Sequence, residues 1–219
     1  NTIAGKNPNV YPQTDWQDEL IKKRTMNQRL NLNMSGGGKV ARYYIAGSAT
    51  KDNGILKVDD DNDFSSNINL KRYLIRSNIN INVTNTTEAV VRVHGTFDDY
   101  RGPIQGGREM YQAIMRTNPV RFPAVYEPDA AHINTQHTLY GNDQAGRYIN
   151  PYAELTRGYK EYSESLMLAQ FELKQDLSFI TEGLRARFLG NTTRNAYFDV
   201  IRNSNPFYYT VSDYDSRND

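Results

Sequence analysis

Apolar and polar residues alternate along the chain from residue 72 to residue 100. Apart from Ser77, every second residue from Tyr73 to Val83 is apolar, and the residues between them are polar except Leu74. A period of two places successive side chains on opposite faces of a β-strand. A polar stretch at 85–88 has the residue types of a turn. The pattern therefore predicts two long strands joined as a hairpin.

The same alternation recurs in two further pairs of segments, one on each side of this hairpin. Short runs of Gly, Ser and other turn formers separate the members of each pair. We therefore predict an all-β antiparallel fold of about six long strands in three hairpins. The predicted strands cover residues 26–35, 40–51, 72–84, 89–100, 163–177 and 184–198.

The connections between the predicted strands alternate between short and long. Each hairpin closes through four to six residues, whereas residues 52–65 and 101–161 form long loops. The spacing of apolar residues within 108–117 predicts a short helix in the second loop. Another short helix is expected after Thr14, with Thr14 as its N-cap and Trp16 as a packing anchor.

Composition narrows the class of protein. The 219 residues include 26 basic and 25 acidic side chains, so no strong overall charge points to nucleic acid. The chain has no cysteine, which excludes disulfides and thiolate chemistry. Its mean hydropathy of −0.74 is low, as in antiparallel sheets with one wet face and in outer-membrane barrels with a polar lumen.

No apolar run approaches the ~20 residues of a membrane-spanning helix, but strands of ~9–11 alternating residues are enough to span a membrane. Three features favour such a transmembrane β-barrel, the first two being strand length and the pattern of loops. The predicted strands exceed the ~5–6 residues usual in globular proteins. Short turns alternating with long loops match the periplasmic turns and extracellular loops of outer-membrane barrels.

The third feature is charge. Through the strand centres, full charges are expected only on the face opposite the apolar residues, because a lipid-facing Lys or Arg at mid-membrane costs ~2–4 kcal/mol. Six strands are too few to close a barrel, so we expect the chain to be a segment of a larger one. The residues assigned to the lumen are Arg72, Arg76, Asn78, Asn80, Arg92, His94, Glu172, Arg185 and Arg187.

A series of short motifs carries a family resemblance. In chain order they are Thr14-Asp15-Trp16-Gln17-Asp18-Glu19, Asn31-Leu32-Asn33-Met34-Ser35-Gly36-Gly37, Ala41-Arg42-Tyr43-Tyr44, Asn53-Gly54-Ile55-Leu56, Lys71-Arg72-Tyr73, Arg76-Ser77-Asn78-Ile79, Arg116-Thr117-Asn118-Pro119, Phe122-Pro123, Asn150-Pro151 and Ile180-Thr181-Glu182-Gly183-Leu184. This ordered set resembles the early barrel of SusC/RagA transporters, which are TonB-dependent outer-membrane receptors.

The resemblance implies a bacterial outer-membrane location and uptake of a glycan or a peptide. It also implies partners: a SusD-like surface lipoprotein, TonB, the remaining barrel and plug segments, and outer-membrane lipid. The first residues show no signal-peptide pattern and no plug sequence. We therefore expect the plug and the segment that contacts TonB to lie in parts of the protein outside this chain.

Candidate ligand-binding side chains gather in the second long loop. Aromatic rings stack on sugars and amides hydrogen-bond to them, so the loop candidates are Tyr111, Tyr126, Tyr140, Asn142 and Tyr148. The alternative is that these side chains pack the loop onto neighbouring loops or onto a partner.

Other chemistry is sparse in the sequence. Asp59, Asp61 and Asp63 alternate like calcium ligands, but Phe64 stands where an EF-hand needs Gly, and a solvated acidic loop is preferred. His132 and His137 lack an obvious third metal ligand and are expected to be solvated. No catalytic motif or cofactor site is found, so we expect a non-enzyme. Two other readings stay open: a soluble β-sandwich that binds carbohydrate, and a passive porin.

Overall fold

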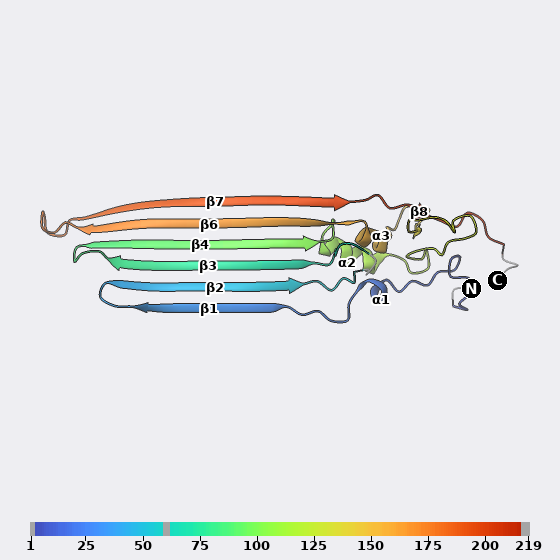
Figure 1. The fold of residues 1–219 in the computed structure, drawn as a ribbon, viewed down its shortest axis with the longest axis horizontal. Helices are drawn as coiled ribbons and strands as arrows, with labels where there is room; N and C mark the ends of the chain where they lie inside the picture. Colours follow the sequence, from blue (N-terminus) through green and yellow to red (C-terminus); the bar gives the residue numbers. More distant parts are fainter. Residues whose placement is uncertain (1–2, 59–61, 216–219) are drawn as a thin grey trace.

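Six long antiparallel strands form one sheet in the computed structural model, which describes residues 3–58 and 62–215 (Figure 1). The strand order is β1-β2-β3-β4-β6-β7, so neighbours in the sheet follow one another along the chain. This confirms the predicted all-β antiparallel fold. The strands are β1 (Gln28–Gly37), β2 (Ala41–Asn53), β3 (Asn69–Asn82), β4 (Thr87–Gly102), β6 (Gly158–Asp176) and β7 (Arg185–Asn203).

The strands extend further than the alternation indicates. β6 begins at Gly158 and β7 ends at Asn203, five residues outside the predicted bounds at each of these ends. Their paired ladder joins Gly158 to Asn203 without interruption, so hydrogen bonding continues where the apolar pattern fades. At 19 residues each, these two strands far exceed the ~5–6 residues typical of globular proteins.

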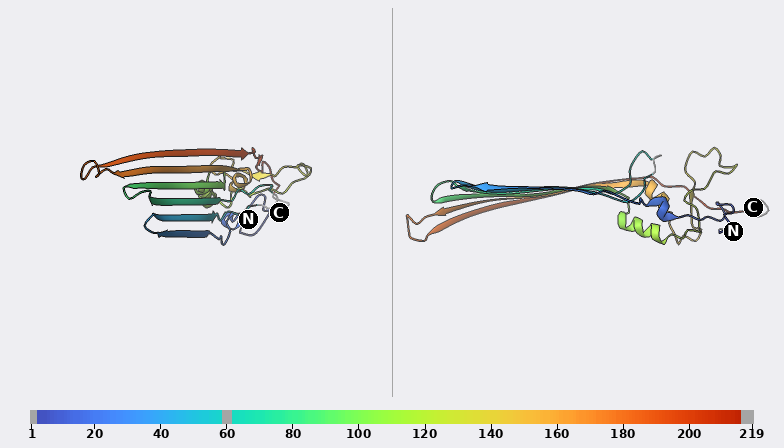
Figure 2. Two further views of the ribbon diagram at one scale, coloured as in Figure 1. Left: turned by 60° about the vertical axis from the view of Figure 1, so that its left-hand side comes forward. Right: turned by 90° about the horizontal axis from the view of Figure 1, so that it is seen from below.

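The sheet is a single open layer. Seen along its edge, it is thin and twisted, and the helices lie beyond one end and do not cover a face (Figure 2). Within the described residues, β1 and β7 each pair on one side only. Both outer strands therefore present unpaired backbone groups to further strands.

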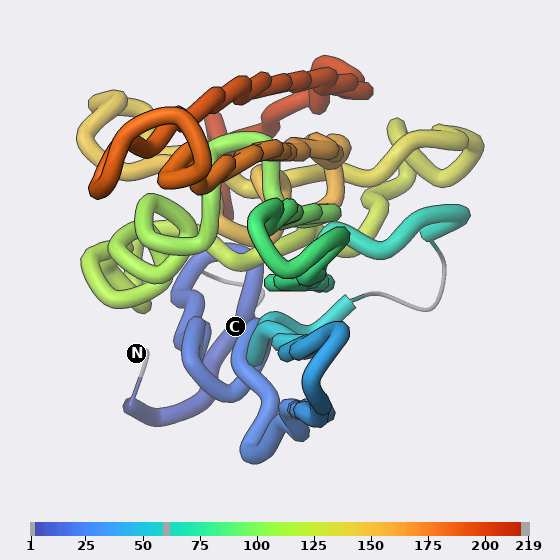
Figure 3. Tube along the Cα trace, turned by 90° about the vertical axis from the view of Figure 1, so that its left-hand side faces the viewer, coloured from blue at the N-terminus to red at the C-terminus, as the bar shows by residue number. Residues whose placement is uncertain are grey.

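The three hairpin turns lie at the end of the sheet away from the helices, the end that faces the viewer in Figure 3, and they are staggered along the strands (Figure 1). The β1–β2 ladder ends at the pair Gly37 and Arg42, and the β3–β4 ladder runs two residues further, to Asn82 and Glu88. The β6–β7 ladder runs two residues beyond that, to Asp176 and Arg185. A steady offset of this kind is the stagger that lets tilted strands close into a barrel.

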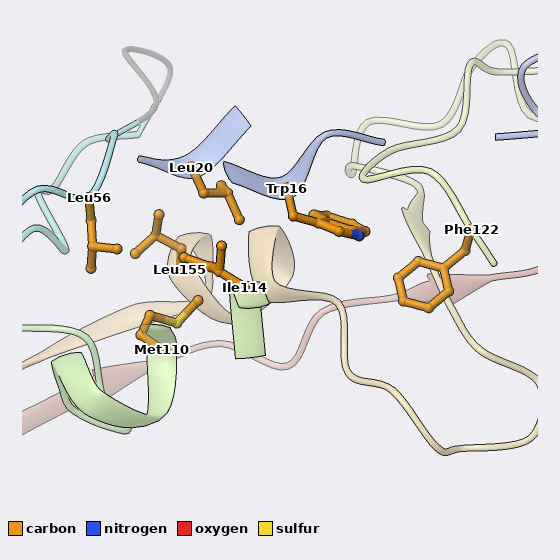
Figure 4. Packing of buried hydrophobic residues seen from close by; sticks show 7 residues of the cluster. All are labelled: Trp16, Leu20, Leu56, Met110, Ile114, Phe122 and Leu155. Carbon is orange, nitrogen blue, oxygen red and sulfur yellow. The ribbon is translucent and has the colours of Figure 1, made fainter. Parts of the chain in front are cut away.

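The loop end of the sheet carries a small packed unit, here called the cap. It contains α1 (Trp16–Leu20), α2 (Gly107–Arg116), α3 (Pro151–Thr156) and the short parallel pair β5 (Tyr140–Gly141) and β8 (Tyr208–Tyr209). Its core is one buried cluster (Figure 4). The cluster consists of Trp16, Leu20, Leu56, Met110, Ile114, Phe122 and Leu155.

Helix starts in the cap follow their capping residues. The carboxylate of Asp15 accepts hydrogen bonds from the amides of Gln17 and Asp18, so the prediction of Thr14 as N-cap is wrong by one residue. The sequence reading also missed α3. Its signal is the Asn150 side chain, which caps the helix, followed by Pro151 in the first turn.

Candidate functional site

The register divides the sheet into an apolar face and a polar face. Rows of directly paired residues cross the strands, and each row belongs to one face. One apolar row joins Leu32, Gly47, Ile75, Gly95 and Met167. Many large side chains on this face are exposed, including Leu30, Leu32, Met34, Tyr43, Tyr73, Ile75, Met167, Phe171, Phe188 and Phe198.

All nine residues predicted to face a lumen lie on the opposite, polar face. Arg76 pairs with His94, Asn78 with Arg92, and Arg72 with Asp98. The residues of β3 and β4 in these pairs therefore lie on the same face of the sheet. Arg92 pairs with Gln170 on β6. The registers of β6 with β4 and β7 then place Glu172, Arg187 and Arg185 on the same face as Arg92. Whether this face lines a lumen stays a prediction, but the register does place all nine on one face, spread along the strands.

Glu172 is the centre of a charged network on the polar face. Its side chain is 3% exposed. Arg92 Nη1 donates to one carboxylate oxygen at 2.9 Å, and Arg187 Nε donates to the other at 2.6 Å. Lys174 Nζ lies 3.8 Å away and also contacts Glu88 at 3.2 Å. A carboxylate excluded from water needs such partners, so the network holds β4, β6 and β7 in register.

Replacing Glu172 with alanine is expected to weaken the sheet measurably. Arg92 and Arg187 would lose their shared acceptor, and breaking a buried pair is costlier than breaking an exposed one. The shift in urea midpoint should be about three times that of Asp98→Ala, which removes the acceptor of the exposed Arg72. The measurement uses the whole receptor, refolded in detergent. Equal shifts for the two variants would contradict this role for Glu172.

A hollow lies beside this network. It has a volume of about 610 Å³ and is lined mainly by Arg76, Asn78, Arg92, His94, Gln170 and Asn191. These side chains offer several hydrogen-bond donors and a positive potential. The hollow suits polar or anionic groups of a ligand or of another protein segment.

The expectation that the apolar face carries no full charge through the strand centres is wrong at one position. Arg194 on β7 pairs with Met167, which places it in the apolar row of Ile75. β7 is an edge strand in this chain, so a neighbour beyond it can meet the Arg194 side chain. The sequence does carry a signal for this charge, because Arg194 follows Phe188, Gly190 and Thr192 at the strand period of two.

The five loop candidates do not form a single site. Tyr126 and Tyr140 lie close, because the Tyr126 amide donates to Leu139 O at 2.8 Å. Burial raises the pKa of Tyr126. Asn142 directly follows β5 and is partly buried. In contrast, Tyr148 packs against the cap core, and Tyr111 is 49% exposed on α2.

Tyr140 is held by aromatic and hydroxyl neighbours. Its hydroxyl lies 2.9 Å from Thr156 Oγ1, and its ring is within 6.4 Å of the rings of Tyr152 and Tyr208. Tyr208 comes from the segment after β7, which returns to pair with β5. Tyr140 therefore helps to fasten the end of the described chain onto the long loop.

His137 is exposed, as predicted, and His132 is partly exposed, but both rings also contact neighbouring side chains. His137 Nε2 lies 2.6 Å from the hydroxyl of Tyr209, and its ring lies 4.4 Å from that of Phe207. His132 hydrogen-bonds to Asp129, which lowers the pKa of Asp129. No sequence signal marks the contact of His137 with Tyr209, because 72 residues separate them.

Glu154 is a buried acidic residue of the cap. Burial raises the pKa of Glu154, although Arg157 lies beside it at 3.0 Å.

Of the three calcium candidates, Asp59 and Asp61 lie outside the described residues, and Asp63 is exposed. In the part of the chain that the structure describes, no three His, Cys, Asp or Glu side chains gather to hold a metal ion. No helix there is long and apolar enough to cross a membrane.

Comparison with known proteins gives a distant relationship. No protein-family model matches the chain. The chain is 27% identical over 165 residues to TonB-dependent receptor P3 from Formosa agariphila. The match covers 72% of this chain and 15% of the length of that relative. This similarity supports a relationship to TonB-dependent receptors.

Proposed function

We propose that the chain is a section of the wall of a TonB-dependent outer-membrane barrel that imports a nutrient. The observation that carries this proposal is the broad apolar face of the sheet. Large side chains such as Leu32, Ile75 and Phe171 are exposed across the strands, and no segment among the described residues covers them. Apolar patches of this extent mark contact with another surface or with lipid.

The polar face fits the other side of such a wall. Glu172, Arg92 and Arg187 lie one residue out of phase with the apolar set, as lumen and lipid residues alternate in barrel strands. Water and further protein segments in the lumen can solvate these charges. The lumen assignment of the nine polar-face residues rests on this alternation.

The two open edges require more strands. Unpaired amides and carbonyls of β1 and β7 are costly in lipid, where no water can satisfy them. The similarity to a much longer TonB-dependent receptor supports a larger barrel of which these six strands are one part. By analogy with bacterial barrels, the staggered short turns face the periplasm and the cap faces outside.

The finer assignment follows the SusC/RagA resemblance of the motifs. On that basis the imported nutrient is a glycan or a peptide, and a SusD-like lipoprotein covers the cap. Tyr126 and Asn142 are the loop residues placed best for the ligand, since Tyr140 and Tyr148 are used in packing and Tyr111 lies apart on α2. The transporter acts on its ligand by binding and passage, not by chemical conversion.

Membrane fractionation tests the proposal. The protein that carries this chain is expected in the outer-membrane fraction and is expected to need detergent for extraction. Recovery as a folded soluble monomer without detergent would favour a soluble β-sandwich module and reject the barrel.

Energy dependence separates the transporter from a passive porin. Uptake of the nutrient should stop in cells that lack TonB, because transport through a plugged barrel needs energy from the inner membrane. Undiminished uptake in those cells would favour the porin.

A further inference from the structure

A cluster of cations lies where the apolar face meets the cap, at the loop ends of the first three strands. Lys51 on β2 pairs directly with Lys71 on β3, and both are exposed. Lys22, Lys23 and Arg24 are exposed in the segment that leads to β1. The Lys22 amide donates to Ile55 O, and Thr25 Oγ1 donates to Asn53 O, which holds this segment beside the end of β2. These five residues are called the basic corner.

Among the described residues, the charges of the basic corner are not ion-paired, whereas several carboxylates on the polar face are. Glu172, Glu88 and Asp98 on the polar face each contact at least one cation. Within residues 3–58 and 62–215, no ion pair involves any of the five cations of the corner. Like charges directly opposite on neighbouring strands are destabilising. The pairing of Lys51 with Lys71 therefore needs another explanation than stability of the sheet.

A carboxylate is close to the corner but is used elsewhere. Asp99 on β4 is the register partner of Lys71 on its other side. Asp99 accepts a hydrogen bond from Ser163 Oγ at 2.8 Å and forms no ion pair with Lys71. The two lysine side chains are thus available to an external anion.

The surroundings of the lysines are apolar on the side of the strand centres. The next row of the same face contains Leu30, Ala49 and Tyr73. A groove of about 260 Å³ joins these residues to Lys51 and Lys71, and its lining is completed by Gln28, Arg29 and Thr50. A ligand that fits both parts carries negative charge at one end and hydrocarbon at the other.

We propose that the basic corner binds the phosphate groups of a membrane lipid, with the acyl chains lying over Leu30, Ala49 and Tyr73. Clusters of Lys and Arg beside a membrane-embedded surface attract anionic headgroups. The inference rests on the proposed function, which places the apolar face in lipid and the cap outside. The bound lipid then belongs to the leaflet on the side of the cap.

The test uses the whole receptor purified in a nonionic detergent. Binding of phosphatidic acid, of diacylglycerol with the same acyl chains and of inorganic phosphate is measured by native mass spectrometry. Phosphatidic acid is expected to bind most tightly, and the double variant Lys51→Gln with Lys71→Gln should weaken it about 20-fold. Lys51→Arg with Lys71→Arg should retain binding, because the charges remain.

A matched control removes two unpaired charges from the cap. Arg108→Gln with Arg116→Gln lowers the net charge equally but should leave lipid binding unchanged, since α2 lies beyond the end of the sheet and lines no part of the groove. Equal weakening by both double variants would overturn the proposal. Equal affinity for phosphatidic acid and diacylglycerol would also overturn it, as would competition by inorganic phosphate at the same concentration.

The experiments distinguish a failure of the lipid-binding proposal from a failure of the proposed function. If the receptor is recovered from the outer membrane but shows no preference for the phosphorylated lipid, only the basic corner fails. If the receptor is recovered as a soluble protein, the lipid-facing assignment fails first.

Discussion

Replacing Ile75 with lysine is expected to destabilise the membrane-inserted protein by about 2–4 kcal/mol. Ile75 lies in the middle of β3 on the apolar face and is 47% exposed. In lipid, an ammonium group at that depth loses its hydration without gaining a partner. Urea unfolding of the whole receptor from lipid vesicles measures the change.

The neighbouring residue supplies a control. Leu74 lies on the polar face, between Ser48 and Thr96 in its row. Leu74→Lys introduces the same side chain one residue away on the same strand, but there it can reach water. A cost below about 1 kcal/mol is expected for this control, as for other exposed substitutions. If both lysines cost the same, the two faces do not differ in environment.

Replacing Trp16 with alanine is expected to cost the cap about 3–5 kcal/mol. Trp16 is 3% exposed, and its ring centroid lies 5.7 Å from that of Phe122. It joins the segment before β1 to the second long loop, so its loss leaves a cavity between the two (Figure 4). The cap should then open locally, and a protease should cleave residues 103–157 much faster.

The strand ladders do not depend on the cap core, so the sheet should survive the loss of Trp16. Heat-modifiable migration on gels, which reports an intact barrel, should stay unchanged in Trp16→Ala. The matched variant Tyr111→Ala removes an aromatic ring that is 49% exposed, and it should leave cleavage near the wild-type rate. Loss of heat-modifiable migration in Trp16→Ala would show that the cap also supports the sheet.

The sheet was predictable because a strand has a side-chain period of two. Ile75, Ile79 and Ile81 reveal that period in the sequence, and the structure places all three in apolar rows. Strand ends were less predictable. From Gly158 to Ser163 the pattern is weak, and only pairing with β4 and β7 extends the strand there.

The cap was predictable only where its signals are local. Trp16 was expected to be an anchor, and its burial confirms this. The contact of His137 with Tyr209 joins residues far apart in the chain, so no local pattern reveals it. Arg194, in contrast, has a local signal, because it follows Phe188, Gly190 and Thr192 at the strand period of two.

Cysteine labelling in membranes tests the assignment of the two faces most directly. The chain has no cysteine of its own, so single substitutions at Leu74, Ile75, Arg76 and Ser77 give an alternating set on β3. In a receptor without other cysteines, a water-soluble maleimide should label positions 74 and 76, and a lipid-phase maleimide should label 75 and 77. Labelling of all four positions by the water-soluble reagent, or the reversed alternation, would contradict a membrane wall whose apolar face lies in lipid.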